Sequence, residues 1–157
     1  MLETLIIADR DVDQAQATML AVRNAGFDNP IFYFRSSAAL IARLATPTQK
    51  APRPSAILID VNLLRECGPE LMRCMRAAEP PIEIAALLGH ERERVLVEQC
   101  GLPQIECVSR PVTPSDVRRL LGVQPKPKPA GHPRLLWPGR PDHLVRPSAR
   151  PVSQHAS

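Results

Sequence analysis

Apolar and polar positions along the first 121 residues follow two patterns in turn. Short apolar runs, several of them rich in β-branched residues, are typical of buried strands, whereas apolar residues recurring every three or four positions are typical of helices. The predicted strands are residues 4–8, 30–34, 55–60, 82–88 and 105–109. The predicted helices are residues 12–26, 36–45, 69–79, 91–101 and 113–121. Five strands therefore alternate with five helices.

Residues that typically begin or end helices mark several of these boundaries. Ser36 and Thr113 are typical N-caps, because a side-chain oxygen there accepts hydrogen bonds from free backbone N–H groups. Gly26 ends the first helix, since glycine readily adopts the left-handed conformation that follows helices. Pro69 suits the first turn of the third helix, where its missing N–H is not needed. The face of the first helix that we expect to be buried carries Val12, Ala15, Met19 and Val22.

This alternation predicts an α/β fold, a doubly wound five-stranded parallel sheet flanked by helices, of the flavodoxin-like type. Parallel strands need crossover connections, which the intervening helices supply. In such sheets ligands bind at the carboxyl ends of the strands, near the point where the strand order reverses. The third apolar run ends on an acid, Asp60. Asp60 is therefore a candidate functional residue.

Residues 122–157 differ in composition from the rest of the chain. They contain eight of the 18 prolines, six of the 20 basic residues and one of the 16 acidic residues, which leaves 14 basic and 15 acidic residues before them. The formal net charge of +4 therefore belongs to this segment. Because proline blocks helices and interior strands, we predict one domain over residues 1–121 and a proline-rich, basic, disordered tail over residues 122–157.

The cysteines and several missing motifs narrow the functional class. The four cysteines form no CxxC pair, and the sequence has no signal peptide and no apolar run of membrane-spanning length. We therefore predict a reduced, cytoplasmic protein with no membrane partner, whose thiols serve as small hydrophobic groups. The motifs GxSxG, GxxxxGK[ST] and GxGxxG are missing, which argues against common hydrolases, triphosphatases and dinucleotide-binding enzymes. A binding module is favoured over an enzyme.

An ordered set of polar residues follows the predicted strands. Asp9 and Asp11 follow the first strand, Asp60 closes the third with Asn62 two positions later, and Arg110 precedes a proline after the fifth. A glycine also stands eight residues after Asp60. In this order and spacing, residues 3–121 resemble the receiver domain of bacterial two-component response regulators.

The resemblance implies a phosphoryl acceptor and a metal site. It makes Asp60 the residue that accepts a phosphoryl group from a sensor histidine kinase or a phosphotransfer protein, as an aspartyl phosphate. It makes Asp9, Asp60 and the backbone carbonyl of Asn62 ligands of Mg²⁺, which prefers hard oxygen ligands. It also places the partner-binding face on the last helices and the last strand.

The sequence departs from the receiver pattern at five positions. Arg10 stands where receivers carry a second acid that binds the metal, and Leu88 stands where they carry a serine or threonine hydroxyl. Cys107 replaces the aromatic switch residue, and Leu64 replaces a common proline. Arg110 replaces a lysine, which keeps the charge but presents a planar fork in place of a compact ammonium. The phosphorylation pocket is therefore degenerate.

Arg10 changes the expected electrostatics of the pocket. We expect its guanidinium to lie near Asp9, Asp11 and Asp60, to neutralise them by a bidentate pair with a carboxylate, and to repel Mg²⁺. Two interpretations of the pocket therefore remain: one that binds Mg²⁺ and one that binds no metal. Simpler roles stay open too: Asp60 as a cap of the turn after its strand, Asp11 as the cap of the first helix, which we prefer for that residue, and Arg110 as a solvated turn residue. Against the last role, the predicted sheet would bring Asp9, Asp60 and Arg110 together at one edge.

Three functional hypotheses follow. The leading one is a stand-alone receiver-like signalling protein of a phosphorelay, which acts through protein–protein contacts with phosphorylation of Asp60 as its candidate switch. The second is a pseudo-receiver that takes no phosphate and serves as a docking or homodimerisation module. The third is a nucleic-acid-associated regulator that acts through the basic tail. It is less favoured, because the chain has few aromatic residues and no recognition helix follows the domain.

Overall fold

The computed structural model describes residues 4–46, 54–78, 80–102 and 105–125. Contacts divide the chain into two units, Met1–Pro125 and Lys126–Ser157. Most of the predicted tail, residues 126–157, lies outside the described residues, so its disorder stays a prediction. None of the described helices is long and apolar enough to cross a membrane.

Strands and helices alternate along the described residues as the sequence predicts. The strands are β1 (Leu5–Ala8), β2 (Ile31–Phe34), β3 (Ala56–Asp60), β4 (Glu83–Leu88) and β5 (Glu106–Ser109). The helices are α1 (Val12–Asn24), α2 (Ser37–Ala45), α3 (Val61–Arg76), a short 3₁₀ turn η1 (Glu91–Glu93), α4 (Arg94–Gln99) and α5 (Pro114–Leu121). The strands pair in parallel in the order β2-β1-β3-β4-β5. The predicted α/β fold with a doubly wound parallel sheet is confirmed.

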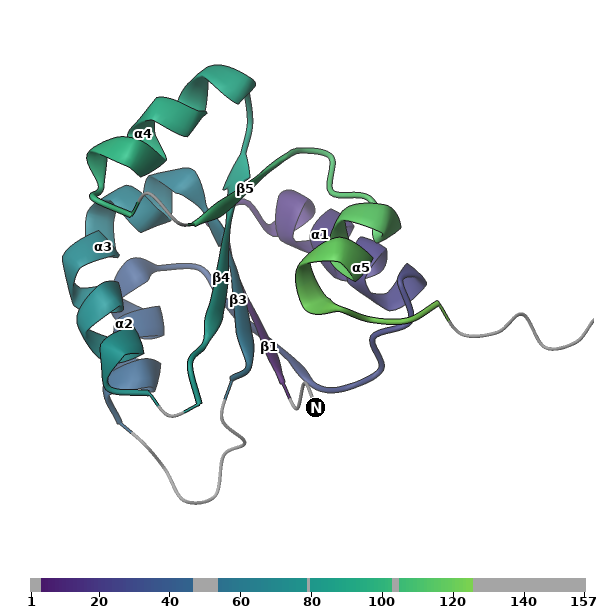
Figure 1. Cartoon of the computed structure of the whole chain (residues 1–157), viewed down its shortest axis with the longest axis horizontal. Helices are drawn as coiled ribbons and strands as arrows, with labels where there is room; N and C mark the ends of the chain where they lie inside the picture. The colour runs from purple at the N-terminus through teal and green to yellow at the C-terminus, as the bar shows by residue number, and fades with distance from the viewer. Residues whose placement is uncertain (1–3, 47–53, 79, 103–104, 126–157) are drawn as a thin grey trace, which may run out of the picture. The chain divides into compact units, whose positions relative to one another are not determined.

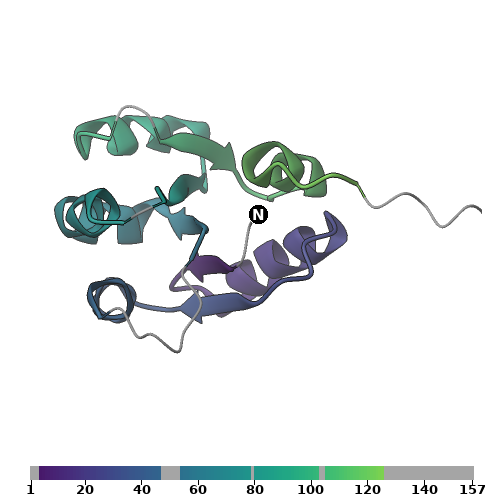
Figure 2. The same cartoon turned by 60° about the horizontal axis from the view of Figure 1, so that its bottom comes forward.

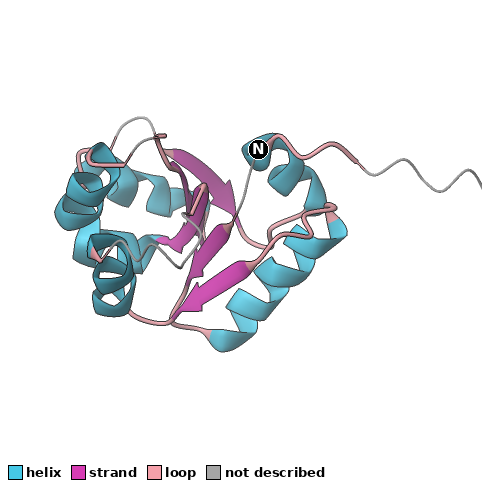
Figure 3. Cartoon of the chain, turned by 90° about the horizontal axis from the view of Figure 1, so that it is seen from below, coloured by secondary structure: helices cyan, strands magenta, loops and turns pink. Residues whose placement is uncertain are grey.

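Helices cover both faces of the sheet. Figure 1 shows α2, α3 and α4 on one face and α1 and α5 on the other, and the views in Figure 2 and Figure 3 agree. One apolar cluster joins the strands to Leu40 of α2, Leu71 of α3 and Val97 of α4. A second joins them to Val22 of α1 and Val117 of α5. These two apolar layers fix the strands, and therefore fix the positions of the residues that follow them.

The pairing of β1 with β3 places two acids at one edge of the sheet. Ala8 and Ile59 are register partners in these parallel strands, and each is followed directly by an aspartate, Asp9 and Asp60. The strand order reverses between β1 and β3. The two acids therefore lie where doubly wound sheets bind ligands.

The helix α3 begins earlier than predicted. It starts at Val61, directly after Asp60, and Pro69 lies inside it, so the placement of Pro69 in the first turn was wrong. An interior proline costs about 3 kcal/mol, but each fully buried large apolar side chain contributes about 1.5–3 kcal/mol. Several residues of α3 are buried on one face, and this face outweighs the proline: Val61, Leu64, Cys67, Gly68 and Leu71.

The predicted helix ends are mostly confirmed. The Ser36 hydroxyl accepts a hydrogen bond from the Ala39 N–H at 3.1 Å, and Thr113 forms a capping box at the start of α5. Gly26 has a positive φ of 100° just after α1. The predicted burial of Val12 was wrong, since this residue is 39% exposed. Val12 begins α1 directly after a polar loop, before the helix reaches the strands that it covers.

Candidate functional site

Arg110 joins the ends of β1 and β3. Its Nη2 donates hydrogen bonds to Asp9 Oδ2 and, at 3.1 Å, to Asp60 Oδ2. The side chains of Arg110, Asp9 and Asp60 are only 11%, 4% and 16% exposed. Three residues that are far apart in the sequence therefore form one ion-pair cluster, largely shielded from solvent.

Further contacts hold Arg110 in this position. Its backbone N–H donates to the carbonyl of Leu88 at the end of β4, at 2.8 Å. Its Nη1 lies 3.5 Å from Gln14 Oε1 on α1. The alternative that Arg110 is a solvated turn residue is therefore wrong, because both its backbone and its guanidinium are bound.

Asp9 is bound on both carboxylate oxygens. Oδ1 accepts from the Asp11 N–H at 2.9 Å, which leaves Oδ2 facing Arg110. Its backbone carbonyl accepts from the Tyr33 hydroxyl at 2.8 Å. Burial raises the pKa of the Tyr33 phenol, with Arg35 opposing the rise and the charge of Asp9 adding to it. The phenol therefore stays a neutral donor at neutral pH.

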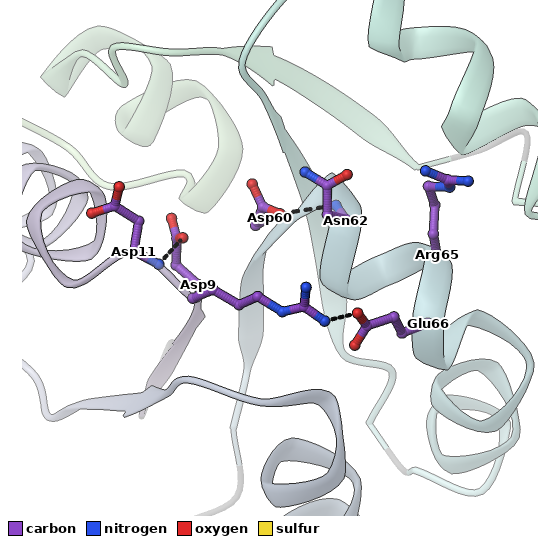
Figure 4. Close-up of a pocket in the computed structure, with 7 residues that line it drawn as sticks. Asp9, Asp11, Asp60, Asn62, Arg65 and Glu66 are labelled. Atoms are coloured by element: carbon purple, nitrogen blue, oxygen red, sulfur yellow. Dashed lines mark hydrogen bonds and ion pairs between the residues drawn. The ribbon is translucent and has the colours of Figure 1, made fainter.

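Asp60 caps α3 while it contacts Arg110. Its Oδ1 accepts from the Asn62 N–H at 2.9 Å, as Figure 4 shows, and the positive end of the helix favours a carboxylate there. Asp60 therefore caps α3 through Oδ1 and contacts Arg110 through Oδ2. Because Asn62 lies in the first turn of α3, its backbone carbonyl belongs to the hydrogen-bond ladder of the helix.

Arg10 does not do what the sequence led us to expect. Its guanidinium forms an ion pair with Glu66 of α3, and the two side chains are 58% and 39% exposed. The other carboxylate oxygen of Glu66 accepts from the Ser37 hydroxyl of α2 at 3.0 Å. The expectation that Arg10 neutralises the aspartates was wrong, because Glu66 offers it a partner at the surface and Arg110 holds the aspartates.

Asp11 is the N-cap of α1, as we preferred. Its Oδ1 accepts from the N–H groups of Asp13 and Gln14, at 2.9 and 3.1 Å. These contacts of the Asp11 carboxylate are those that begin the helix.

The two remaining pocket positions are apolar in character. Leu88 is completely buried in the apolar cluster that α2, α3 and α4 share, and Cys107 of β5 packs against the same cluster. Burial raises the pKa of the Cys107 thiol, and Arg94 opposes the rise. The edge of the sheet next to Asp60 therefore offers neither a hydroxyl from Leu88 nor an aromatic ring from Cys107.

An open cavity of about 580 Å³ lies above the aspartates. It is lined by Asp9, Arg10, Asp11, Asp60, Asn62, Arg65 and Glu66, and Figure 4 shows Arg65 and Glu66 extending from α3, with Glu66 pointing toward the loop that carries Asp9 and Asp11. The sequence analysis missed Arg65 and Glu66. Extending the apolar spacing of α3 back to Val61 would have found them, since both then fall on the first turns of a helix that begins at this edge.

The residues implied as Mg²⁺ ligands do not fit the ion in this arrangement. Mg²⁺ requires several oxygens in octahedral order at about 2.0–2.1 Å. All four carboxylate oxygens of Asp9 and Asp60 already accept hydrogen bonds, and both Oδ2 atoms share the Arg110 Nη2. The Asn62 carbonyl lies in the first turn of α3, where it also serves as a helical acceptor. Within the described ranges, no group of three or more His, Cys, Asp or Glu side chains is placed to hold a metal.

Comparison with known proteins identifies the fold. No protein-family model matches the sequence, and no curated protein matches it. Among solved structures, the bacteriophytochrome response regulator AtBRR matches 79% of this chain and 95% of its own, with 18% identity and a TM-score of 0.63.

Two further matches are of the same kind. The chemotaxis response regulator CheY4 of Vibrio cholerae matches 78% of this chain and 98% of its own, with 18% identity and a TM-score of 0.57. A CheY-like receiver domain protein from Methanospirillum hungatei matches 78% and 92%, with 16% identity and a TM-score of 0.55. The chain therefore has the fold of response-regulator receiver domains.

Proposed function

We propose that this chain is a receiver-like signalling protein that acts through contacts with other proteins and does not depend on phosphorylation of Asp60. The observation that carries the proposal is the shared contact of Arg110 Nη2 with Asp9 and Asp60. The chain thus already supplies a cation to the two carboxylates of the pocket. The partner is a downstream protein of a bacterial, cytoplasmic signalling pathway, or a second copy of the chain.

The chemistry of phosphoryl transfer supports this choice. An acceptor carboxylate must present an oxygen in line with the phosphorus, and the surroundings must neutralise the charge that gathers on the phosphoryl oxygens. Here Asp60 Oδ1 caps α3 and Oδ2 binds Arg110. Arg10, the nearest further cation on the β1–α1 loop, is paired with Glu66. Two of the arginines at this edge, Arg110 and Arg10, are therefore already engaged with carboxylates.

A second candidate function is phosphorylation of Asp60, which its exposure to the open cavity favours. In that case a carboxylate oxygen of Asp60 forms a bond to phosphorus while the phosphorus–nitrogen bond of a phosphohistidine on a kinase or phosphotransfer protein breaks. The imidazole leaves with the bonding electron pair and takes up a proton. Arg110 would then exchange one carboxylate contact for a phosphoryl oxygen.

One experiment separates the two functions. The full chain is incubated with a small phosphoramidate or acyl phosphate, with and without Mg²⁺, and its intact mass is measured. A response regulator that is known to accept phosphate from the same donor serves as the positive control. We expect no mass gain in the wild type, as in Asp60→Asn. A base-labile gain of one phosphoryl group that disappears in Asp60→Asn would establish the second function and reject the first.

A further inference from the structure

We propose that Arg110 takes the place of a divalent cation at this site, so that the Asp9–Asp60 pair is held without metal and becomes cation-dependent when Arg110 is removed. This inference deepens the proposed function, because it names what keeps the domain in one state. It concerns the stability of the site, and it is tested without any phosphodonor.

The arrangement of donors carries the inference. One nitrogen, Arg110 Nη2, lies between Asp9 Oδ2 and Asp60 Oδ2, in the bridging position that a cation shared by two carboxylates would take. Two carboxylates and one guanidinium leave one negative charge, which the Asp11 N–H and the first turn of α3 stabilise. The cluster is therefore complete without an ion.

The guanidinium and a metal ion compete for the same oxygens. A divalent ion at Asp9 and Asp60 would have to displace Nη2 from both Oδ2 atoms. The displaced arginine would stay close, because its backbone N–H is bound to the Leu88 carbonyl. Its charge would then repel the ion across a site that is largely shielded from water. Binding of Mg²⁺ to the wild type would therefore break the buried contacts of Arg110 with the two aspartates and would place the ion close to the positive charge of Arg110.

Removal of Arg110 reverses this balance. Asp9 and Asp60 would keep their backbone N–H donors but would face each other as two shielded negative charges. Mg²⁺ or Ca²⁺ can then enter from the open cavity and take the bridging position. A neutral substitution at Arg110 should therefore create a dependence of stability on divalent cations that the wild type lacks.

The test measures thermal unfolding of the full chain in chelator and in millimolar Mg²⁺ or Ca²⁺. We expect no shift of the wild-type Tm on adding the cation. Arg110→Gln should unfold about 10 °C lower in chelator, because an unpaired buried charge is costly, and should recover part of that loss in the cation. Arg119→Gln is the matched control, since Arg119 is an exposed arginine in an ion pair with Glu106. It should show neither effect.

Two results would overturn the inference. One is a wild-type Tm that rises with Mg²⁺ by more than the Tm of Asp9→Asn, which lacks one of the two carboxylates. The other is an Arg110→Gln protein whose Tm changes with neither Mg²⁺ nor Ca²⁺. If Arg110→Gln does not fold in chelator, its refolding yield is measured with and without the cation instead. The double variant Arg110→Gln with Asp9→Asn has only one of the two carboxylates, and its stability should no longer depend on the cation.

Failure of this inference and failure of the proposed function are distinguishable. If Asp60 gains a phosphoryl group while the wild-type Tm does not change with Mg²⁺, the proposed function is rejected and the role of Arg110 stands. A wild type stabilised by Mg²⁺ that gains no phosphoryl group rejects the role of Arg110 alone.

Discussion

The β1–α1 loop and the β5–α5 loop each place one arginine at the same edge of the sheet, and the two arginines differ in burial and in partners. Arg10 is 58% exposed and pairs with Glu66 at the surface. Arg110 is 11% exposed and binds two aspartates that solvent scarcely reaches. Each loop carries one arginine, but only the second inserts its guanidinium among the strand ends.

The comparison teaches that the burial of an arginine, more than the number of charges around it, decides how much it contributes to the stability of the domain. Exposed ion pairs contribute about 0–1 kcal/mol, because water competes and two long side chains lose freedom. Loss of one partner from a buried pair costs about 3–5 kcal/mol, because the remaining charge stays desolvated. Arg110 should therefore dominate the energetics of this edge.

The largest expected effect comes from substituting the two arginines in the same way. Arg110→Gln should lower the free energy of unfolding by about 3–5 kcal/mol, and Arg10→Gln by less than about 1 kcal/mol. Urea denaturation followed by circular dichroism measures both in the same buffer. Equal losses in the two variants would contradict the contrast between the loops.

The two aspartates should differ from each other as well. Asp9→Asn should cost about 2–3 kcal/mol, because it breaks a charge-assisted contact at an almost fully buried side chain. Asp60→Asn should cost about 1 kcal/mol, because asparagine still caps α3. Denaturation of both variants checks this order, and a larger loss for Asp60→Asn would mean that the helix cap outweighs the ion pair.

Within the β1–α1 loop, the helix cap Asp11 should contribute more to stability than Arg10. Asp11→Ala removes the acceptor for the Asp13 and Gln14 N–H groups and should cost about 1 kcal/mol. Asp11→Asn, which preserves the cap, is the matched control and should stay close to the wild type. A loss in Asp11→Ala no greater than in Arg10→Gln would show that the loop has no dominant residue.

The smallest effect should be at Glu66. Glu66→Gln removes the charge that pairs with Arg10 and should change stability by less than about 1 kcal/mol, and high salt should reduce the difference further, because both side chains are exposed. The loss in Arg110→Gln should persist in the same salt. Unfolding curves at low and high sodium chloride test both statements, and a salt-independent loss at Glu66 would argue that this pair is effectively buried.

Most of the fold could be predicted from local patterns. The apolar runs that became β1, β3 and β4 are buried on both faces, so their sequences are almost wholly apolar and easy to recognise. The meeting of Asp9 and Asp60 followed from parallel strands that end at one edge. These features depend on the backbone, which the pattern specifies.

The direction of the Arg10 side chain could not be predicted in the same way. It depends on which partner each loop meets, and the partner of Arg10 was hidden because the prediction began α3 at Pro69. Glu66 therefore stood in a presumed loop, although it lies on the first turns of the helix. Arg10 was expected near the aspartates because it stands between Asp9 and Asp11, and the error in the helix boundary hid the competing partner Glu66.

The most direct test of the role of Arg110 is Mn²⁺ titration of the wild-type chain, followed by the amide resonances of Asp11, Asn62 and Arg110. Mn²⁺ accepts the same oxygen ligands as Mg²⁺ and broadens signals near its site. We predict that these three amides broaden no more than exposed amides elsewhere, and that they broaden selectively in Arg110→Gln. Selective broadening in the wild type at substoichiometric Mn²⁺ would contradict the claim that Arg110 holds the site in place of a metal.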